Sequence, residues 1–199
     1  MTEFLEFPKM ARLSRECVIT EKIDGTNAQI YITDHGQLYV GSRTRWITPQ
    51  DDNHGFARWV ESNKEEIMKL GPGRHFGEWW GLGIQRNYGL KEKRLSLFNT
   101  IRWCLHDATP QPTNSSGGLQ EKLPQCIGLV PIIHKGIFDT SYVEAALSSL
   151  NVNGSFAAPG FMKPEGIVVY HVSAGVGFKK TLEKDEVPKS LANKEPILV

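Results

Sequence analysis

One lysine in this chain is surrounded by residue types that phosphate chemistry uses. Lys22 begins the motif KIDGTN (22–27), which lies between two apolar runs that predict strands over residues 17–22 and 28–33. An Asp-Gly pair between two such runs indicates a hairpin or a tight turn, so Lys22 is expected to end a strand. A solvated lysine before an ordinary turn is the alternative interpretation. The polar neighbours that we take as candidate site residues are Glu21, Asp24 and Asn27.

The chemistry open to Lys22 is nucleophilic attack on phosphorus. A lysine amine attacks only as the neutral base, whereas an ordinary lysine, with a pKa near ~10.4, is almost wholly protonated at neutral pH. Desolvation and nearby cations both disfavour the ammonium form. The sequence offers Arg43, Lys179, Lys180 and a nucleotide-bound metal ion as candidate cations. Lys22 is therefore the predicted nucleophile.

Two carboxylates stand at the edges of apolar or aromatic runs. Glu78 follows Gly77 in the run HFGEWWG (75–81), and a carboxylate beside such a glycine suits a ribose hydroxyl. A surface glutamate beside core tryptophans is the alternative. Glu165 precedes the buried-strand pattern of residues 166–172. Because a buried carboxylate needs a partner, a lysine or a hydrated magnesium ion would serve there.

Six short motifs follow one another along the chain. They are KIDGTN (22–27), GSR (41–43), FGEW (76–79), LFN (97–99), EGIVVY (165–170) and FKK (178–180). In this order they resemble the motifs of the covalent nucleotidyltransferase superfamily of polynucleotide ligases and capping enzymes, and within it the ATP-dependent RNA ligases. DNA ligases of this superfamily usually carry arginine where this chain has Asn27, so the resemblance favours an RNA ligase.

The resemblance implies a role for each candidate residue. Lys22 would become linked to AMP, Phe98 would face the adenine, and Glu165 would lie near the metal, directly or through water. By composition alone, Phe98 is more often a core residue. The implied cofactors are ATP and Mg2+ or Mn2+. The implied nucleotide-binding set is Glu21, Asp24, Asn27, Arg43, Glu78, Phe98, Glu165, Lys179 and Lys180.

Lys179 and Lys180 depart from the family, which usually has two lysines separated by one residue. Adjacent side chains on a strand point to opposite faces, so only one of the two can face the site in a regular strand. We predict that Lys179 does so, because it follows an aromatic residue as in the family, and we leave a contribution of Lys180 open. Solvated edge-strand charges are the alternative. Arg43 and Arg45 alternate along another predicted strand, so they are expected to share a face.

The pattern along the chain is that of an α+β protein. Helices are predicted from Asp51 to Leu70 and from Ser141, as the N-cap, to Leu150, and an exposed loop over 107–124. The resemblance implies a nucleotidyltransferase (adenylation) domain of antiparallel sheets flanked by helices, ATP-grasp-like, without an OB-fold domain. Strands are predicted over residues 17–22, 28–33, 37–43, 73–80, 96–105, 129–134, 166–172 and 175–181.

One domain is expected over residues 1–199. The chain is 40% apolar, and about nineteen residues follow the motifs of 22–180, fewer than the ~50 residues of a small domain. Three widely spaced cysteines support neither a disulfide framework nor a zinc ribbon, and we find no signal peptide or membrane-spanning run. A cytoplasmic, reducing location is therefore expected.

The net charge of +1 is no nucleic-acid signature, but one basic cluster is suggestive. Tyr88 and the pair Trp79-Trp80 lie among the basic residues Arg86, Lys91, Lys93 and Arg94. Such a cluster suits either a strand-binding surface or a solvated loop over core tryptophans.

These inferences predict an ATP-dependent RNA ligase that acts through lysyl-AMP on RNA ends or nicks, in RNA repair. The 107–124 loop or a partner protein would help to hold the nucleic acid. A small ATP-dependent DNA ligase is one alternative, and a nucleotide- or RNA-binding module without turnover is another.

Overall fold

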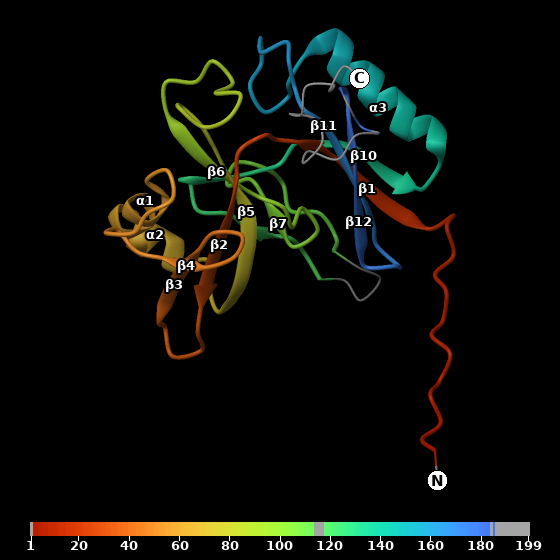
Figure 1. Cartoon of the computed structure of the whole chain (residues 1–199), viewed down its shortest axis with the longest axis horizontal. Coiled ribbons are helices and arrows are strands. Elements are labelled where there is room, and N and C mark those ends of the chain that lie inside the picture. The colour runs from red at the N-terminus through yellow and green to blue at the C-terminus, as the bar shows by residue number, and fades with distance from the viewer. Residues whose placement is uncertain (1, 114–117, 184, 186–199) are drawn as a thin grey trace, which may run out of the picture.

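Antiparallel sheets dominate the structure, a computed structural model that describes residues 2–113, 118–183 and 185 (Figure 1). The strands are β1 (Glu16–Lys22), β2 (Thr26–Ile32), β3 (Leu38–Gly41), β4 (Trp46–Ile47), β5 (Gly73–Gly81), β6 (Lys93–Leu97), β7 (Trp103–Cys104), β8 (Glu121–Lys122), β9 (Ile127–Leu129), β10 (Ile132–Ile137), β11 (Gly166–His171) and β12 (Val176–Thr181). The helices are α1 (Phe56–Ser62), α2 (Lys64–Met68) and α3 (Thr140–Asn153). The expected α+β class is confirmed. Among the described residues, no helix has the length and apolar character needed to cross a membrane.

The larger sheet has the order β4-β3-β2-β5-β6-β9, and all its pairs are antiparallel except β6 with β9. On β2, Ala28, Ile30 and Ile32 point to one face because side chains alternate along a strand. They pack against α1 and α2 in the main hydrophobic core, which includes Phe56 and Ile67. The other face of β2 carries Asn27, Gln29 and Tyr31.

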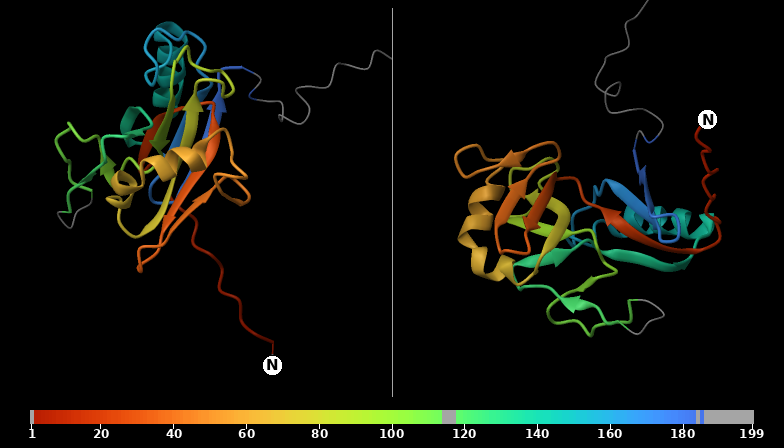
Figure 2. Two further views of the ribbon diagram at one scale, coloured as in Figure 1. Left: turned by 90° about the vertical axis from the view of Figure 1, so that its left-hand side faces the viewer. Right: turned by 90° about the horizontal axis from the view of Figure 1, so that it is seen from below.

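The smaller sheet has the order β10-β1-β11-β12 and is antiparallel throughout. Helix α3 covers one face, where Ala146 and Leu150 pack against Ile19 and Ile167 in a separate hydrophobic cluster. Figure 2 shows the two sheets next to each other, with α1 and α2 on the outside of one and α3 on the other. The Asp139 side chain caps α3 by accepting a hydrogen bond from the backbone of Ser141, so the N-cap predicted at Ser141 lies two residues too late.

Of the two structures expected at the Asp-Gly pair, a hairpin or a tight turn, the hairpin is wrong. The two strands belong to different sheets and do not pair with each other. A Cβ on Gly25 would lie 2.5 Å from the carbonyl oxygen of Trp79 and 2.7 Å from Cβ of Trp80. The Asp-Gly pair is therefore needed for close backbone contact with β5, and its glycine does not mark a hairpin turn.

Several predicted boundaries also change. The strand predicted over 37–43 ends at Gly41, and that over 96–105 becomes β6 and β7 with a turn between them. The predicted helix of 51–70 begins only after Gly55, whose φ of 80° is left-handed, and it is interrupted at Asn63. The predicted loop of 107–124 contains β8 and a bridge between residues 112 and 119, while 114–117 lie outside the described residues.

Candidate active site

A cavity of about 1070 Å³ has walls from both sheets. The smaller sheet contributes Lys22 of β1 and Lys179 of β12, and the larger sheet contributes Asn27 of β2 and Glu78 of β5. The segment that follows β6, including Phe98, forms a further wall. The structure thus brings residues from five of the six motifs into or beside one cavity.

Lys22 is the last residue of β1 and is paired with Gly166 of β11. Its amine forms an ion pair with Glu165, the residue before β11. The Lys22 side chain is 21% exposed and that of Glu165 only 3%, so the amine lies at the boundary between core and cavity. Of the two partners offered for Glu165, a lysine and a hydrated magnesium ion, the structure shows the lysine, because the strand pairing of Lys22 with Gly166 brings Glu165 next to it.

Asp24 stabilises the turn after Lys22. Its backbone N–H donates to the Tyr88 hydroxyl at 2.7 Å, and its carboxylate accepts from Arg86 Nε at 3.0 Å. Arg86 also donates to the carbonyl of Lys163 at 3.0 Å, so the turn is tied to the segment before Glu165. Of the two roles open to Asp24, orienting the amine or fixing the turn, these contacts support the second.

Glu78 lies opposite Asn27 in the pairing of β2 with β5, so both side chains are on the cavity face. The Glu78 carboxylate is 9% exposed and accepts the backbone N–H of Gly25 at 3.0 Å. Burial raises the pKa of Glu78 to about 7, although the Gly25 hydrogen bond and the Lys22 charge favour ionisation. Because Glu78 is buried in the cavity wall, the alternative of a surface glutamate is wrong.

The Glu78→Gln variant should gain stability over the native protein as pH rises. Between the ordinary pKa of 4.5 and the folded value of about 7, the folded state keeps a proton that the unfolded chain has lost. Native stability therefore falls through this window, and the difference should reach about 2–3 kcal/mol. Urea unfolding at about pH 5 and about pH 8 measures it. Glu16→Gln, on an exposed part of β1, is the control, and equal pH dependence in the Glu78 variant and the native protein would contradict the prediction.

Lys179 and Lys180 point to opposite faces of the smaller sheet, as predicted. Lys179 is paired with Val168, which is paired with Thr20, and all three line the cavity. Lys180 is paired with Ile167, which packs under α3. Lys180 therefore lies on the α3 side and does not line this cavity.

Glu21 is 1% exposed, and its carboxylate is hydrogen-bonded to a neighbouring loop. It accepts hydrogen bonds from the hydroxyl of Ser155 at 2.6 Å and from the backbone N–H groups of Phe156 and Ala157 at 2.8 and 2.9 Å. Burial raises the pKa of Glu21, while these bonds lower it. The Glu21 side chain thus holds the loop, so only its backbone is left for nucleotide contact.

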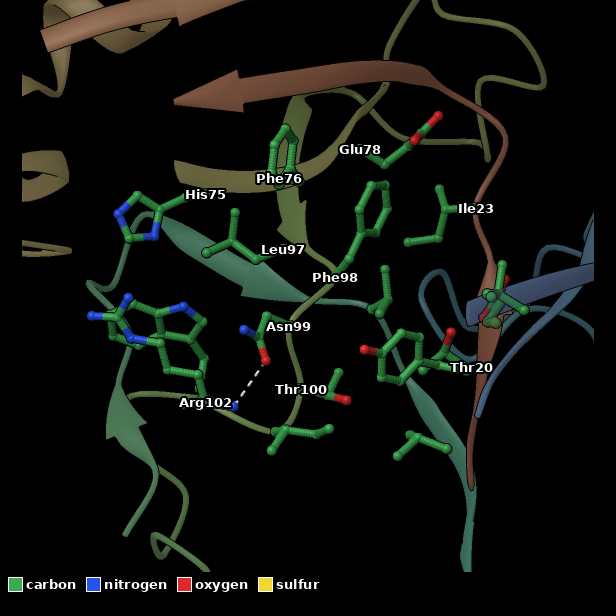
Figure 3. A pocket seen from close by; sticks show the side chains of 18 of the residues that line it. Thr20, Ile23, His75, Phe76, Glu78, Leu97, Phe98, Asn99, Thr100 and Arg102 are labelled. Carbon is green, nitrogen blue, oxygen red and sulfur yellow. Dashed lines mark hydrogen bonds between the residues drawn. The ribbon is translucent and has the colours of Figure 1, made fainter. Parts of the chain in front are cut away.

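Phe98 is 43% exposed and lines the cavity, so the alternative of a core residue is wrong. Its N–H donates to the carbonyl of Phe76 at 3.0 Å. Figure 3 shows the Phe98 ring near Phe76, with Glu78 and Ile23 beyond it. Phe76, 51% exposed, was missed as a site residue. The sequence indicates Phe76 as well, because it lies two residues before Glu78 and therefore on the same face of a strand.

Arg43 does not line this cavity. It lies exposed in the turn between β3 and β4, beyond Gly41 where β3 ends, so the expected alternation with Arg45 along a strand does not apply. Arg45 instead forms an ion pair with Asp51.

The basic cluster of residues 86–94 is not a stacking surface. Trp79, Trp80 and Tyr88 are only 1–2% exposed and belong to the hydrophobic clusters. Arg86 is ion-paired with Asp24, and the amine of Lys93 donates to a backbone carbonyl. The interpretation as a loop over core aromatic residues is therefore correct.

The carboxylates beside Lys22 fit a hard divalent cation, which prefers oxygen ligands. Glu165 and Glu78 supply such oxygens on two walls of the site, and the Glu78 pKa responds to the charges of both Lys22 and Glu165. Within the described ranges, no group of three or more His, Cys, Asp or Glu side chains is placed to hold a metal by itself. A metal ion here would need further ligands from phosphate oxygens or water.

Comparison of the chain with known proteins identifies its family. Residues 15–184 match the family model described as RNA ligase. No curated protein matches the chain. A Naegleria gruberi RNA ligase mutant solved with ATP and Mn matches with a TM-score of 0.55 and 17% identity, over 84% of this chain and 49% of that one. An apo mutant gives 0.57 and 19%, over 85% and 50%.

A third Naegleria gruberi RNA ligase mutant, also with ATP and Mn, gives a TM-score of 0.55 and 19% identity over 91% of this chain and 57% of that one. At this identity the likeness shows a common fold, and the present chain spans about half the length of the structures it matches. The family match, in contrast, extends over most of the chain. The chain therefore belongs to the RNA ligase family.

Proposed function

We propose that this protein is an ATP-dependent RNA ligase that works through a lysyl-AMP intermediate. The observation that carries the proposal is the position of the Lys22 amine, at a strand end beside a cavity with walls from both sheets. Lys179 faces the same cavity from β12, and two half-exposed phenylalanine rings face it from β5 and the segment after β6. A cation for phosphate, an aromatic face for a base and a nucleophilic amine are thus brought together.

The proposed reaction has three steps. Lys22 Nζ attacks the α-phosphorus of ATP, a P–N bond forms, the bond to the bridging oxygen breaks and pyrophosphate leaves. An oxygen of an RNA 5′-phosphate then attacks the AMP phosphorus, which frees Lys22. A 3′-hydroxyl next displaces AMP and closes the phosphodiester. The ammonium of Lys22 must lose a proton before the first step, and the ion-paired carboxylate of Glu165 is in contact to accept it.

Mg2+ or Mn2+ would be held by Glu165, directly or through water, together with nucleotide phosphates. When bound, such an ion neutralises charge that develops on the phosphates and on the departing pyrophosphate. Lys179 serves the α-phosphate from β12, on the same sheet as Lys22 and Glu165. Glu78 and Asn27 are proposed to contact the ribose and the phosphates, and Phe98 the adenine. Lys180 and Arg43 do not line this cavity, so we leave them out of the proposed set.

Labelling of the protein with ATP and with GTP tests which nucleotide it uses. We expect a mass gain of one AMP per chain with ATP and magnesium, and at least about fivefold less labelling with GTP. Stacking on Phe98 tolerates any purine. Selection is assigned to the backbone carbonyl at Glu21, which would accept from the adenine amine but oppose the guanine oxygen, at about 1–3 kcal/mol. Comparable transfer of GMP would overturn the adenylate assignment and favour capping-type chemistry.

A sealing assay with matched RNA and DNA substrates tests which nucleic acid the protein joins. We propose RNA ends or nicks as the substrate, in a repair role inside the cell, where a partner protein could add nucleic-acid contacts. Sealing of DNA in preference to RNA would favour the small DNA ligase. AMP labelling without sealing of either strand would favour a module without turnover.

A further inference from the structure

Three aromatic side chains and one arginine form a cluster on the larger sheet, which we call the aromatic platform: Tyr31, Tyr39, Trp46 and Arg74. Tyr31 of β2 is paired with Tyr39 of β3 and with Arg74 of β5. The ring centroids of Tyr31 and Tyr39 are 6.0 Å apart, and those of Tyr39 and Trp46 are 5.7 Å apart. Tyr39 is 42% exposed and Trp46 48%, so both rings are open to a ligand.

The platform lies on the face of the sheet that forms the active site. Asn27 and Tyr31 are four residues apart on β2, so they point to one face. Asn27 is paired with Glu78 and Tyr31 with Arg74 on β5. Strands β3 and β4 lie at the free end of this sheet, beyond β2 (Figure 1). A strand that leaves the cavity in this direction therefore meets the platform.

Arg74 joins the cavity to the platform. It lines the cavity, and its guanidinium carbon lies 4.1 Å from the ring centroid of Tyr31 and 5.6 Å from that of Trp46. A guanidinium stacked on a ring keeps its N–H edges for an anion. No described carboxylate forms an ion pair with Arg74, whereas five other arginines have such a partner: Arg45, Arg58, Arg86, Arg94 and Arg102.

A glycine makes room for the outermost ring. Gly41 of β3 is paired with Trp46 of β4, and a Cβ on Gly41 would lie 3.2 Å from the indole. The absence of a side chain lets the indole lie close against the strand, near both tyrosines. The arrangement of the rings is thus fixed by strand pairing and by this glycine.

We propose that the aromatic platform binds the single-stranded RNA that enters the active site, with bases against Trp46 and Tyr39 and a phosphate on Arg74. This inference rests on the proposed function, because it supplies the RNA that the adenylylated lysine would meet. Every base has a flat face, so aromatic stacking accepts any sequence, which suits an enzyme that joins ends.

Charge and position favour a polynucleotide over a protein on this surface. Arg74 lies within the platform, and Arg43 is exposed in the turn that leads to Trp46. Cations beside open rings match the alternating phosphates and bases of a single strand. The platform is also continuous with the cavity through Arg74, so a strand on it is directed toward Lys22.

RNA affinity tests the platform directly. The probe is a fluorescent, 5′-phosphorylated RNA oligonucleotide with a blocked 3′ end, measured by anisotropy without ATP. Trp46→Ala should raise Kd about tenfold, and Trp46→Phe should raise it less because a ring remains. Tyr142→Ala is the matched control, because Tyr142 is an aromatic residue on α3 that is 45% exposed. It should leave Kd unchanged. Melting temperatures confirm that each variant is folded.

The salt dependence tests Arg74. Arg74→Gln should weaken binding and reduce the slope of log Kd against log salt by about 0.7, the value for one phosphate contact on a single strand. Arg58→Gln, an ion-paired arginine on α1, should not change the slope. An unchanged slope in the Arg74 variant, or an unchanged Kd in a folded Trp46→Ala variant, overturns the proposal.

Lysyl-AMP formation without RNA separates this inference from the proposed function. If the native protein forms no lysyl-AMP, the proposed function fails. If it forms lysyl-AMP and the Trp46→Ala variant also does so but binds RNA as the native protein does, the platform alone is refuted. Retained labelling with weakened RNA binding in the Trp46→Ala variant supports both.

Discussion

Lys22→Arg should abolish AMP labelling while the protein stays folded. Arginine keeps a positive charge beside Glu165, so the buried carboxylate retains a cation. It cannot lose its proton at a workable pH and therefore cannot act as the nucleophile. Mass spectrometry after incubation with ATP and magnesium should show no gain of AMP, and a loss of at least about a thousandfold in labelling rate is expected because the bond-forming atom is replaced.

Lys22→Ala should also abolish labelling, but at a cost in stability. Removing the amine takes one partner from a carboxylate that is 3% exposed, which destabilises a buried pair by about 3–5 kcal/mol. The double variant Lys22→Ala, Glu165→Gln should recover part of this loss without recovering labelling. Lys180→Ala, on the other face of the sheet, is the control for both measurements. AMP found on a folded Lys22→Arg protein would assign the nucleophile to another residue.

Lys179→Ala should slow lysyl-AMP formation by about a hundredfold, the typical effect of removing one positioned group that stabilises transition-state charge. Lys180→Ala should change the rate by less than about threefold, because its side chain lies on the α3 side of the sheet. Single-turnover labelling with limiting time points measures both rates. Neither lysine belongs to a hydrophobic cluster, so the melting temperatures of both variants should be similar to that of the native protein.

The relative loss of labelling rate in the Lys179→Ala and Lys180→Ala variants tells which lysine contacts the phosphate. Equal losses would indicate that both lysines reach one phosphate site in the nucleotide-bound protein. A larger loss with Lys180→Ala would show that the FKK motif (178–180) is displaced by one residue in this chain.

Local sequence patterns predicted those features that depend on strand alternation. Lys179 and Lys180 are adjacent, so their opposite orientation follows from the pleat of one strand, and the pairing of β12 with β11 confirms it. The end of β1 at Lys22, predicted from the Asp-Gly pair that follows the apolar run, is also confirmed. The family motifs placed Glu78 and Phe98, and the cavity now includes both.

Contacts between distant segments could not be predicted in this way. The Glu21 carboxylate is bound by residues 155–157, more than one hundred positions away, and no periodicity within β1 indicates this. The hairpin prediction failed because an Asp-Gly pair reports local turn preference but not which sheet the next strand joins. The choice between a stacking surface and a loop over core tryptophans stayed open in the sequence, because a basic neighbourhood does not reveal which side of a strand is buried.

Residues 23–25, which connect β1 to β2, form a short joint between the two sheets. Lys22 is tied to Glu165 on the smaller sheet, and Gly25, three residues later, is tied to Glu78 on the larger one. A nucleotide that touches Lys179 on one side and Phe98 on the other would act as a brace across this joint. Part of its binding energy would then be used to hold the two halves at one angle. The Lys22 amine, the proposed nucleophile, lies at the start of this joint, where a change of that angle would move it less than groups farther out on either sheet.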